Sequence, residues 1–190
     1  MSKDNKIGTS NKWAIQKMTV SALLISIGLL IPLISPLKIV VEPISFTLAS
    51  HVAIFIAMMI DPAVAIVVAL GTALGFFLSF PIVIALRALS HVVFAAIGSF
   101  YLKRHRDTLD SLKKIHIFSF VIALIHAFFE TVVVFVFYFG TSNVGSTPIQ
   151  TVLLFIGLGS VIHSMVDFEI AYFIYKPLSK QRTFSNEAVR

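Results

Sequence analysis

Residues Ala63 to Phe80 read AVAIVVALGTALGFFLSF, an apolar stretch without a charged residue. A helix needs about 20 predominantly apolar residues to cross the hydrocarbon core of a bilayer. The stretch follows Asp61-Pro62, where Asp suits a helix N-cap and Pro suits the first helical turn, and it ends before Pro81. We therefore predict a membrane-spanning helix here, because backbone groups in lipid must be satisfied within the segment itself.

Further apolar runs flank this segment and predict an all-α membrane protein, a six-transmembrane-helix bundle in a single domain covering residues 1–190. Long continuous runs, rather than alternating segments of roughly ten residues, exclude a transmembrane β-barrel. The spans are expected at Met18 to Leu33, Ile44 to Ile60, Ala63 to Phe80, Pro81 to Leu102, Ile115 to Phe139 and Ile149 to Tyr175. The bundle (18–175) then lies between polar tails at 1–17 and 176–190, with a polar loop from Gly140 to Pro148.

Composition and charge placement favour a multi-pass protein of the cell membrane. Charged residues make up 13% of the chain, against about 25% in a soluble domain. All but two of the 15 basic residues flank the predicted spans on one side, so the positive-inside rule places both termini in the cytoplasm. The exceptions are Lys38, on the opposite side, and Arg87, inside a span. Topology thus explains the formal net charge of +6, and no nucleic-acid partner is expected.

Ionisable side chains inside the predicted spans point to a function, because each costs about 2.5–3.5 kcal/mol to insert on translocon-based scales. They are His51, Arg87, His91, His126, Glu130, His163, Asp167 and Glu169. Three pairs have i, i+4 spacing and therefore share a helix face: Arg87 with His91, His126 with Glu130, and His163 with Asp167. Polar stripes on three successive spans are expected to face one another inside the bundle.

Arg87 is the strongest candidate for a ligand contact, because a guanidinium group can bind a carboxylate through two hydrogen bonds. The candidate substrate-binding residues are Arg87, His91, His126, Glu130, His51 and His163, with the first four around an outward-facing pocket. The alternative is a purely structural ion pair between Arg87 and Glu130. Asp167 and Glu169 fall nearer the cytoplasmic end and are expected to meet a partner or the basic tail.

Missing motifs restrict the chemistry. The chain has no Cys, which excludes disulfides, thiolate metal sites and Cys nucleophiles, and no Walker motif for binding ATP. The His and carboxylate residues could hold a metal, but the doubled Glu and Glu-x-x-His motifs of dimetal bundles are absent. We expect no catalytic residue and no metal. An intramembrane metal-dependent enzyme remains the alternative of another class, and a protein whose polar stripes only hold helices together is a third.

The chain resembles the S-component of an energy-coupling factor (ECF) vitamin transporter over nearly its whole length. The shared features are six short spans, cytoplasmic termini and the lack of an ATPase motif. The resemblance implies a non-enzymatic subunit that binds a vitamin on the outer side. A membrane coupling subunit and two ATPase subunits supply the energy, so ATP is used by the partners and this chain has no cofactor. The family's first span packs on the coupling subunit through Ala-x-x-x-Ala, matched here by Ala22-x-x-x-Ser26. In that family spans four to six line the pocket and the loop after span one caps it, so the resemblance implies the same here, with Ser35 to Ser45 matching the loop by position.

Two runs are similar to the subfamily assigned to niacin: FTLASHV at Phe46 to Val52 and LRALSH at Leu86 to His91. Nicotinate is a small aromatic carboxylate, so the resemblance implies that Arg87 takes the carboxylate, Phe side chains flank the ring and a His bonds the ring nitrogen. Pantothenate or another carboxylate vitamin fits Arg87 equally well and remains the alternative.

Overall fold

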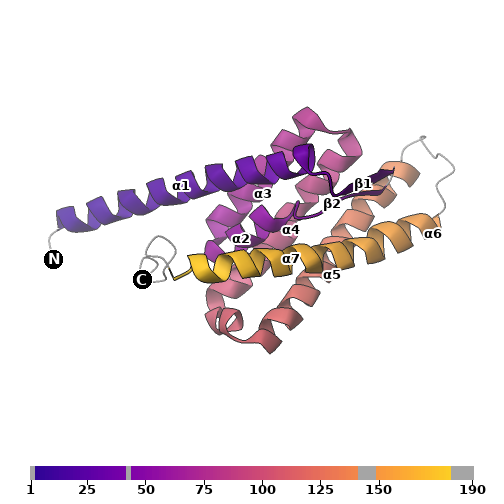
Figure 1. Cartoon of the computed structure of the whole chain (residues 1–190). Coiled ribbons are helices and arrows are strands. Elements are labelled where there is room, and N and C mark those ends of the chain that lie inside the picture. The colour runs from indigo at the N-terminus through magenta and orange to yellow at the C-terminus, as the bar shows by residue number, and fades with distance from the viewer. Residues whose placement is uncertain (1–2, 42–43, 141–148, 181–190) are drawn as a thin grey trace.

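The computed structural model describes residues 3–41, 44–140 and 149–180, which form a helical bundle with a short β-hairpin (Figure 1). The helices are α1 (Lys3–Ile34), α2 (Val52–Ile60), α3 (Pro62–Ser79), α4 (Ile82–Arg104), α5 (Leu112–Phe139), α6 (Ile149–Thr151) and α7 (Gly159–Leu178). The antiparallel strands are β1 (Lys38–Val41) and β2 (Ile44–Thr47). A 3-10 turn, η1 (Arg106–Asp110), precedes α5, and a π-helical stretch, η2 (Val152–Leu158), links α6 to α7. Most of the predicted polar loop, 141–148, and of the C-terminal tail, 181–190, lies outside the described residues.

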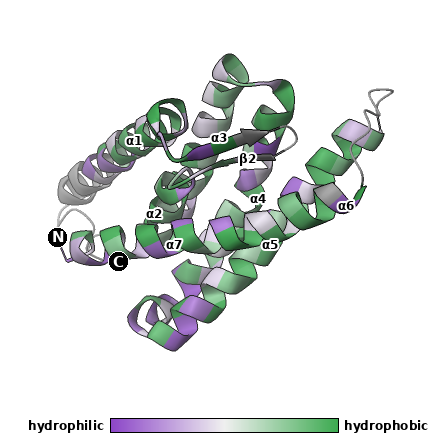
Figure 2. Ribbon diagram, turned by 45° about the vertical axis from the view of Figure 1, so that its right-hand side comes forward, coloured by the Kyte–Doolittle hydropathy of each residue, from purple (hydrophilic) through white to green (hydrophobic). Residues whose placement is uncertain are grey.

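Within the described ranges, five helices are long and apolar enough to cross a membrane, which confirms a multi-pass α-helical protein. They cover Lys12–Ile34, Pro62–Ser79, Ile82–Arg104, Leu112–Phe139 and Val152–Leu178. Hydrophobic residues predominate along the long helices (Figure 2). Leu78 is 90% exposed and Phe173 is 82% exposed. Such side chains need no protein cover in a bilayer, because lipid tails are themselves apolar.

The prediction of a full-length second span at Ile44 to Ile60 is wrong. β2 occupies its first part, and α2 has only 9 residues, or about 14 Å at 1.5 Å per residue. That is roughly half of the 30 Å hydrocarbon core. Non-helical backbone at this depth is tolerated where protein surrounds it or where it lines a cavity. The hairpin and α2 together still return the chain, so the start of α1 and the end of α7 lie at the same end of the bundle (Figure 1).

The first helix extends beyond the predicted span, because α1 starts at Lys3 and so includes most of the predicted polar tail at 1–17. No proline precedes Pro32 in this segment, and a helix started in the apolar part extends at little cost per residue. Lys17 Nζ lies 3.1 Å from Asp61 Oδ2, which ties α1 to the start of α3.

Small residues on α3 allow α1 to pack closely. A Cβ placed on Gly71 would lie 2.4 Å from Ile25 Cδ1, and one on Gly75 would lie 2.2 Å from Leu29 Cδ2. Small residues four positions apart permit this close approach of membrane helices. The two glycines therefore determine which face of α1 turns toward the bundle.

Helix α2 lies in the centre of the bundle, with residues 52–59 all buried. Its C-terminal carbonyls are capped by residues distant in sequence. Arg106 donates to the carbonyl oxygens of Met59 (2.7 Å) and Ile60 (3.1 Å), and the hydroxyl of Tyr175 donates to Met59 O at 3.2 Å. The predicted cap after α2 is confirmed, since the Asp61 carboxylate accepts from Ala63 N at 2.9 Å. These contacts fix the end of α2 that lies away from the hairpin.

Candidate functional site

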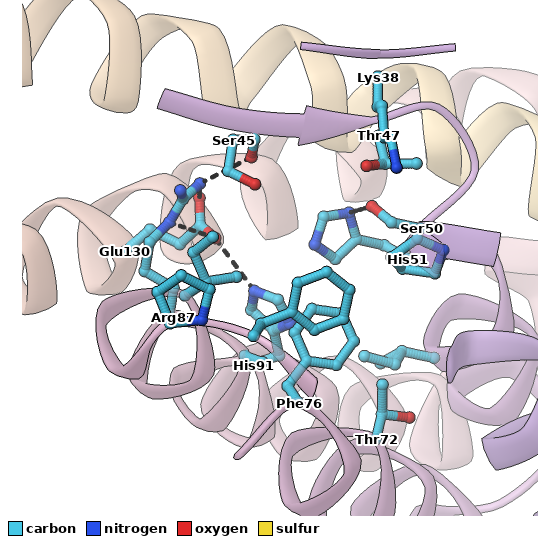
Figure 3. Close-up of a pocket in the computed structure, with 16 residues that line it drawn as sticks. Lys38, Ser45, Thr47, Ser50, His51, Thr72, Phe76, Arg87, His91 and Glu130 are labelled. Atoms are coloured by element: carbon cyan, nitrogen blue, oxygen red, sulfur yellow. Dashed lines mark hydrogen bonds and ion pairs between the residues drawn. The ribbon is translucent and has the colours of Figure 1, made fainter. Parts of the chain in front are cut away.

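A cavity of about 380 Å³ lies beneath the hairpin, between α1, α3 and α4 (Figure 3). This volume falls in the range of roughly 300–1,000 Å³ that is typical of small-molecule sites. Its polar lining is Lys38, Ser45, Thr47, Ser50, His51, Thr72, Arg87, His91 and Glu130. Aromatic side chains of α3 and its C-terminal cap, Phe76 and Phe80, form an apolar wall, with ring centroids 4.6 Å apart in a stacked pair.

Arg87 of α4 and Glu130 of α5 form a buried ion pair at the edge of the cavity, and they are 4% and 3% exposed. Arg87 donates through Nε to Glu130 Oε1 at 3.3 Å and through Nη2 to Oε2 at 3.1 Å. Its Nη2 also donates to the carbonyl oxygen of Ser45, 3.3 Å away in β2. Glu130 further accepts from His91 Nε2 at 3.1 Å and from the hydroxyl of Ser160. The ion pair thus joins the hairpin to α4, α5 and α7.

A second carboxylate, Asp167, was expected to meet a partner or the basic tail, but within the described residues it lies where α2 begins and binds backbone N–H groups there. It is fully buried and accepts from Ala49 N at 2.7 Å, His51 N at 2.9 Å and His51 Nδ1 at 3.0 Å. Ala49 has φ 67°, a left-handed conformation that costs a residue with a Cβ about 1–2 kcal/mol. The hydrogen bond to Asp167 offsets that strain. Glu169, also expected at a partner or the tail, lies 2.9 Å from Nδ1 of the exposed His116.

Imidazole rings join the two carboxylates into one cluster. The ring of His51 has its centroid 4.6 Å from His91, 4.6 Å from His126 and 5.0 Å from His163. His163 Nε2 lies 3.2 Å from the hydroxyl of Ser50. His126 is 1% exposed, and neither of its ring nitrogens has a hydrogen-bond partner among the described residues.

The structure brings the six predicted binding residues together, but not all of them reach the cavity. Arg87, His91, Glu130 and His51 line it, whereas His126 and His163 lie behind this wall. The lining by spans four to six agrees with the cavity only in part, because α4 supplies Arg87 and His91 among other lining residues. In the part of the chain that the structure describes, α7 contributes no lining residue and α5 contributes Glu130, while α3 forms one side. Because α2 is short, it leaves a space that is bordered by α3 and the hairpin. The predicted capping segment does lie over the cavity, where Lys38 and Ser45 line it.

Two kinds of lining residue were missed by the sequence reasoning. Thr72 and Phe76 lie one helical turn apart on α3, a span that carries no charge to attract notice. Lys38 extends from β1 toward the cavity (Figure 3). Its signal was present, since it is the one basic residue placed on the side of the membrane opposite the others.

Ala22 and Ser26 lie on an exposed face of α1, and the Ser26 hydroxyl donates to Ala22 O at 2.9 Å. The face that packs on α3 carries Ile25 and Leu29 instead. The small pair therefore does not pack within the bundle.

Two overlapping groups of side chains have geometry suited to a metal ion. Their ligand atoms all lie within 4.8 Å of one another within each group. One group is His51, His91, His126 and Glu130, and the other is His51, His163 and Asp167.

The chain is 38% identical over 180 residues to the niacin transporter NiaX of Lactococcus lactis subsp. cremoris, a match that covers 94% of this chain and 81% of the relative. No protein-family profile matches the chain. No solved structure matches it.

Proposed function

The chain belongs to the niacin-transporter family of ECF S-components, and we propose that it binds nicotinate in the cavity beneath the β1–β2 hairpin. Its similarity to a niacin transporter over nearly its full length carries this proposal. The chain is accordingly a multi-pass membrane protein and not an enzyme. We take the site residues from the lining of the cavity, where an aromatic wall and cationic side chains suit a flat aromatic carboxylate.

Two cations are present among the described lining residues, and they differ in how they are paired. Arg87 already donates to Glu130 through two nitrogens, so its charge is balanced before a ligand arrives. Lys38 forms no ion pair within the described part of the chain. We infer that the nicotinate carboxylate is received by both cations, with Lys38 closing over it from the hairpin. Phe76 and Phe80 then flank the ring, and an imidazole of the cluster bonds the pyridine nitrogen.

Binding of nicotinate to the purified protein tests this function, with nicotinamide and pantothenate as competitors. Wild type should prefer nicotinate to its amide, because the cations gain nothing from a neutral carboxamide. Lys38→Ala should lower nicotinate affinity about threefold to tenfold, as expected for loss of one partly exposed charge contact, and leave nicotinamide affinity unchanged. Lys103→Ala is the matched control, because Lys103 is an exposed lysine near the C-terminal end of α4 and does not line the cavity. Preference for pantothenate, or equal affinity for acid and amide, would contradict the proposal.

The proposed orientation and partners rest on the surface of the bundle. The hairpin lies at the end opposite the start of α1 and the end of α7 (Figure 1), and we propose that it faces the outside, with both termini in the cytoplasm. A membrane coupling subunit would then dock on the exposed Ala22 and Ser26 face of α1, and two ATPase subunits would hydrolyse ATP. Exposed small residues support this choice, because they permit close helix approach.

A further inference from the structure

We propose that His51, His91, His126 and Glu130 form a binding site for a divalent transition-metal ion, of the Zn²⁺ class, in the inner wall of the cavity. Their ligand atoms lie within 4.8 Å of one another, and the four side chains are buried. Zinc binds imidazole and carboxylate at about 2.0–2.2 Å, so these atoms need to draw in by about 1 Å. Imidazole with one carboxylate is a donor set that suits Zn, Cu, Fe and Ni.

His126 is the observation that points to an ion. Its Nδ1 and Nε2 lack hydrogen-bond partners among the described residues, and the nearest carboxylate oxygen, Glu130 Oε1, lies 3.5 Å from Nε2. The ring also lies 4.7 Å from the ring of Phe94 between centroids. A buried polar group without a partner destabilises the folded state, so an apolar residue would be more stable at this position if nothing bound there. A metal ion would give the orphaned imidazole its partner.

His51 is held in the form that a metal requires. Asp167 Oδ2 lies 3.0 Å from His51 Nδ1 and also accepts from its backbone N–H at 2.9 Å. The carboxylate therefore accepts a hydrogen bond from Nδ1–H and leaves the Nε2 lone pair for the cluster. A carboxylate behind an imidazole is the usual way in which proteins orient a metal-binding histidine. Asp167 is thus a positioning residue in this site.

The charges of the site also favour a cation, in a step that rests on the proposed function. With neutral imidazoles, the form that binds metals, Arg87 is offset by Glu130 and Lys38 is left to meet the nicotinate carboxylate. The buried carboxylate of Asp167 then has no Lys or Arg partner among the described residues, which is unfavourable. A divalent ion bound to His51, whose Nδ1 lies 3.0 Å from Asp167 Oδ2, supplies that positive charge. Since His51, His91 and Glu130 border the cavity, the ion would lie within reach of the vitamin.

Metal analysis of the full-length purified protein tests the site. The protein is stripped with EDTA, loaded with Zn²⁺ or with Co²⁺ as a visible-absorption probe, and passed through gel filtration. Wild type should retain about one equivalent. His126→Leu should lose it and still fold, because an apolar residue replaces an unsatisfied polar one. His116→Ala, which removes an exposed histidine outside the cluster, is the control and should retain the metal.

Different results separate this proposal from the proposed function. Failure of wild type to retain metal, or equal retention by His126→Leu, would overturn the site. Loss in His163→Ala but not in His126→Leu would also overturn it, because the ion would then belong to the group that includes Asp167. We expect stripped protein to bind nicotinate at least tenfold more weakly and Zn²⁺ to restore binding. Unchanged affinity would overturn the ion's part in binding the vitamin, whereas retained metal without any nicotinate binding would refute the proposed function and leave the site standing.

Discussion

Replacing Arg87 by Ala should destabilise the protein as well as weaken vitamin binding, and the structure gives the size of the first effect. The change removes two hydrogen bonds to Glu130, one to the carbonyl of Ser45, and a cation over the Phe46 ring at 5.8 Å. It also strands a carboxylate that is 3% exposed. Breaking a buried ion pair from one side costs about 3–5 kcal/mol. The midpoint of thermal unfolding should fall accordingly.

The double variant Arg87→Ala with Glu130→Gln separates the structural role from binding. The neutral amide leaves no buried charge, so most of the lost stability should return. If Arg87 contacts the vitamin, the double variant still lacks a hydrogen bond to a charged group, worth about 1.5–3 kcal/mol. Nicotinate affinity should then fall about tenfold to a hundredfold, measured by calorimetry with metal content determined on the same sample. Arg87→Lys should recover only part of this, because Lys lacks the planar fork. Full nicotinate affinity in the folded double variant would refute a ligand role for Arg87.

Further predictions concern topology, coupling and the hairpin. Cysteines introduced at Asp110 and Gln150 into a chain without Cys should label from opposite sides of the membrane, and labelling from one side would contradict a crossing by α5, which lies between them. Ala22→Trp should abolish uptake in cells and leave nicotinate binding to the purified protein unchanged; equal loss of both would show that this face packs internally. Gly159→Ala places a Cβ 2.9 Å from the Phe46 ring of the hairpin, so it should displace the hairpin and raise the nicotinate dissociation rate severalfold in a stopped-flow assay. Gly157→Ala meets its nearest atom at 3.6 Å and should have no effect.

Much of the bundle could be predicted because lipid acts on each residue by its own hydropathy. The break at Asp61-Pro62 and the end of a span before Pro81 follow from local rules for caps and proline, and both occur in the structure. The i, i+4 spacing of His126 and Glu130 likewise placed them on one face, and the cost of a charge in lipid required Arg87 to find a partner. The sequence alone thus determined the spans, apart from the second, and the ionisable residues that lie between them.

The start of α2 was decided only by tertiary structure. Residues 44–51 are apolar enough to continue a helix, but Ala49 turns into a left-handed conformation because its N–H is bound by Asp167, 118 positions later in the chain. That contact shortens α2, opens the cavity to α3 and aims His51 at His126. Hydropathy describes how favourably each residue lies in water or in lipid. It does not report that the Asp167 carboxylate, on a distant helix, accepts the hydrogen bond of the Ala49 N–H, because that contact exists only in the packed bundle.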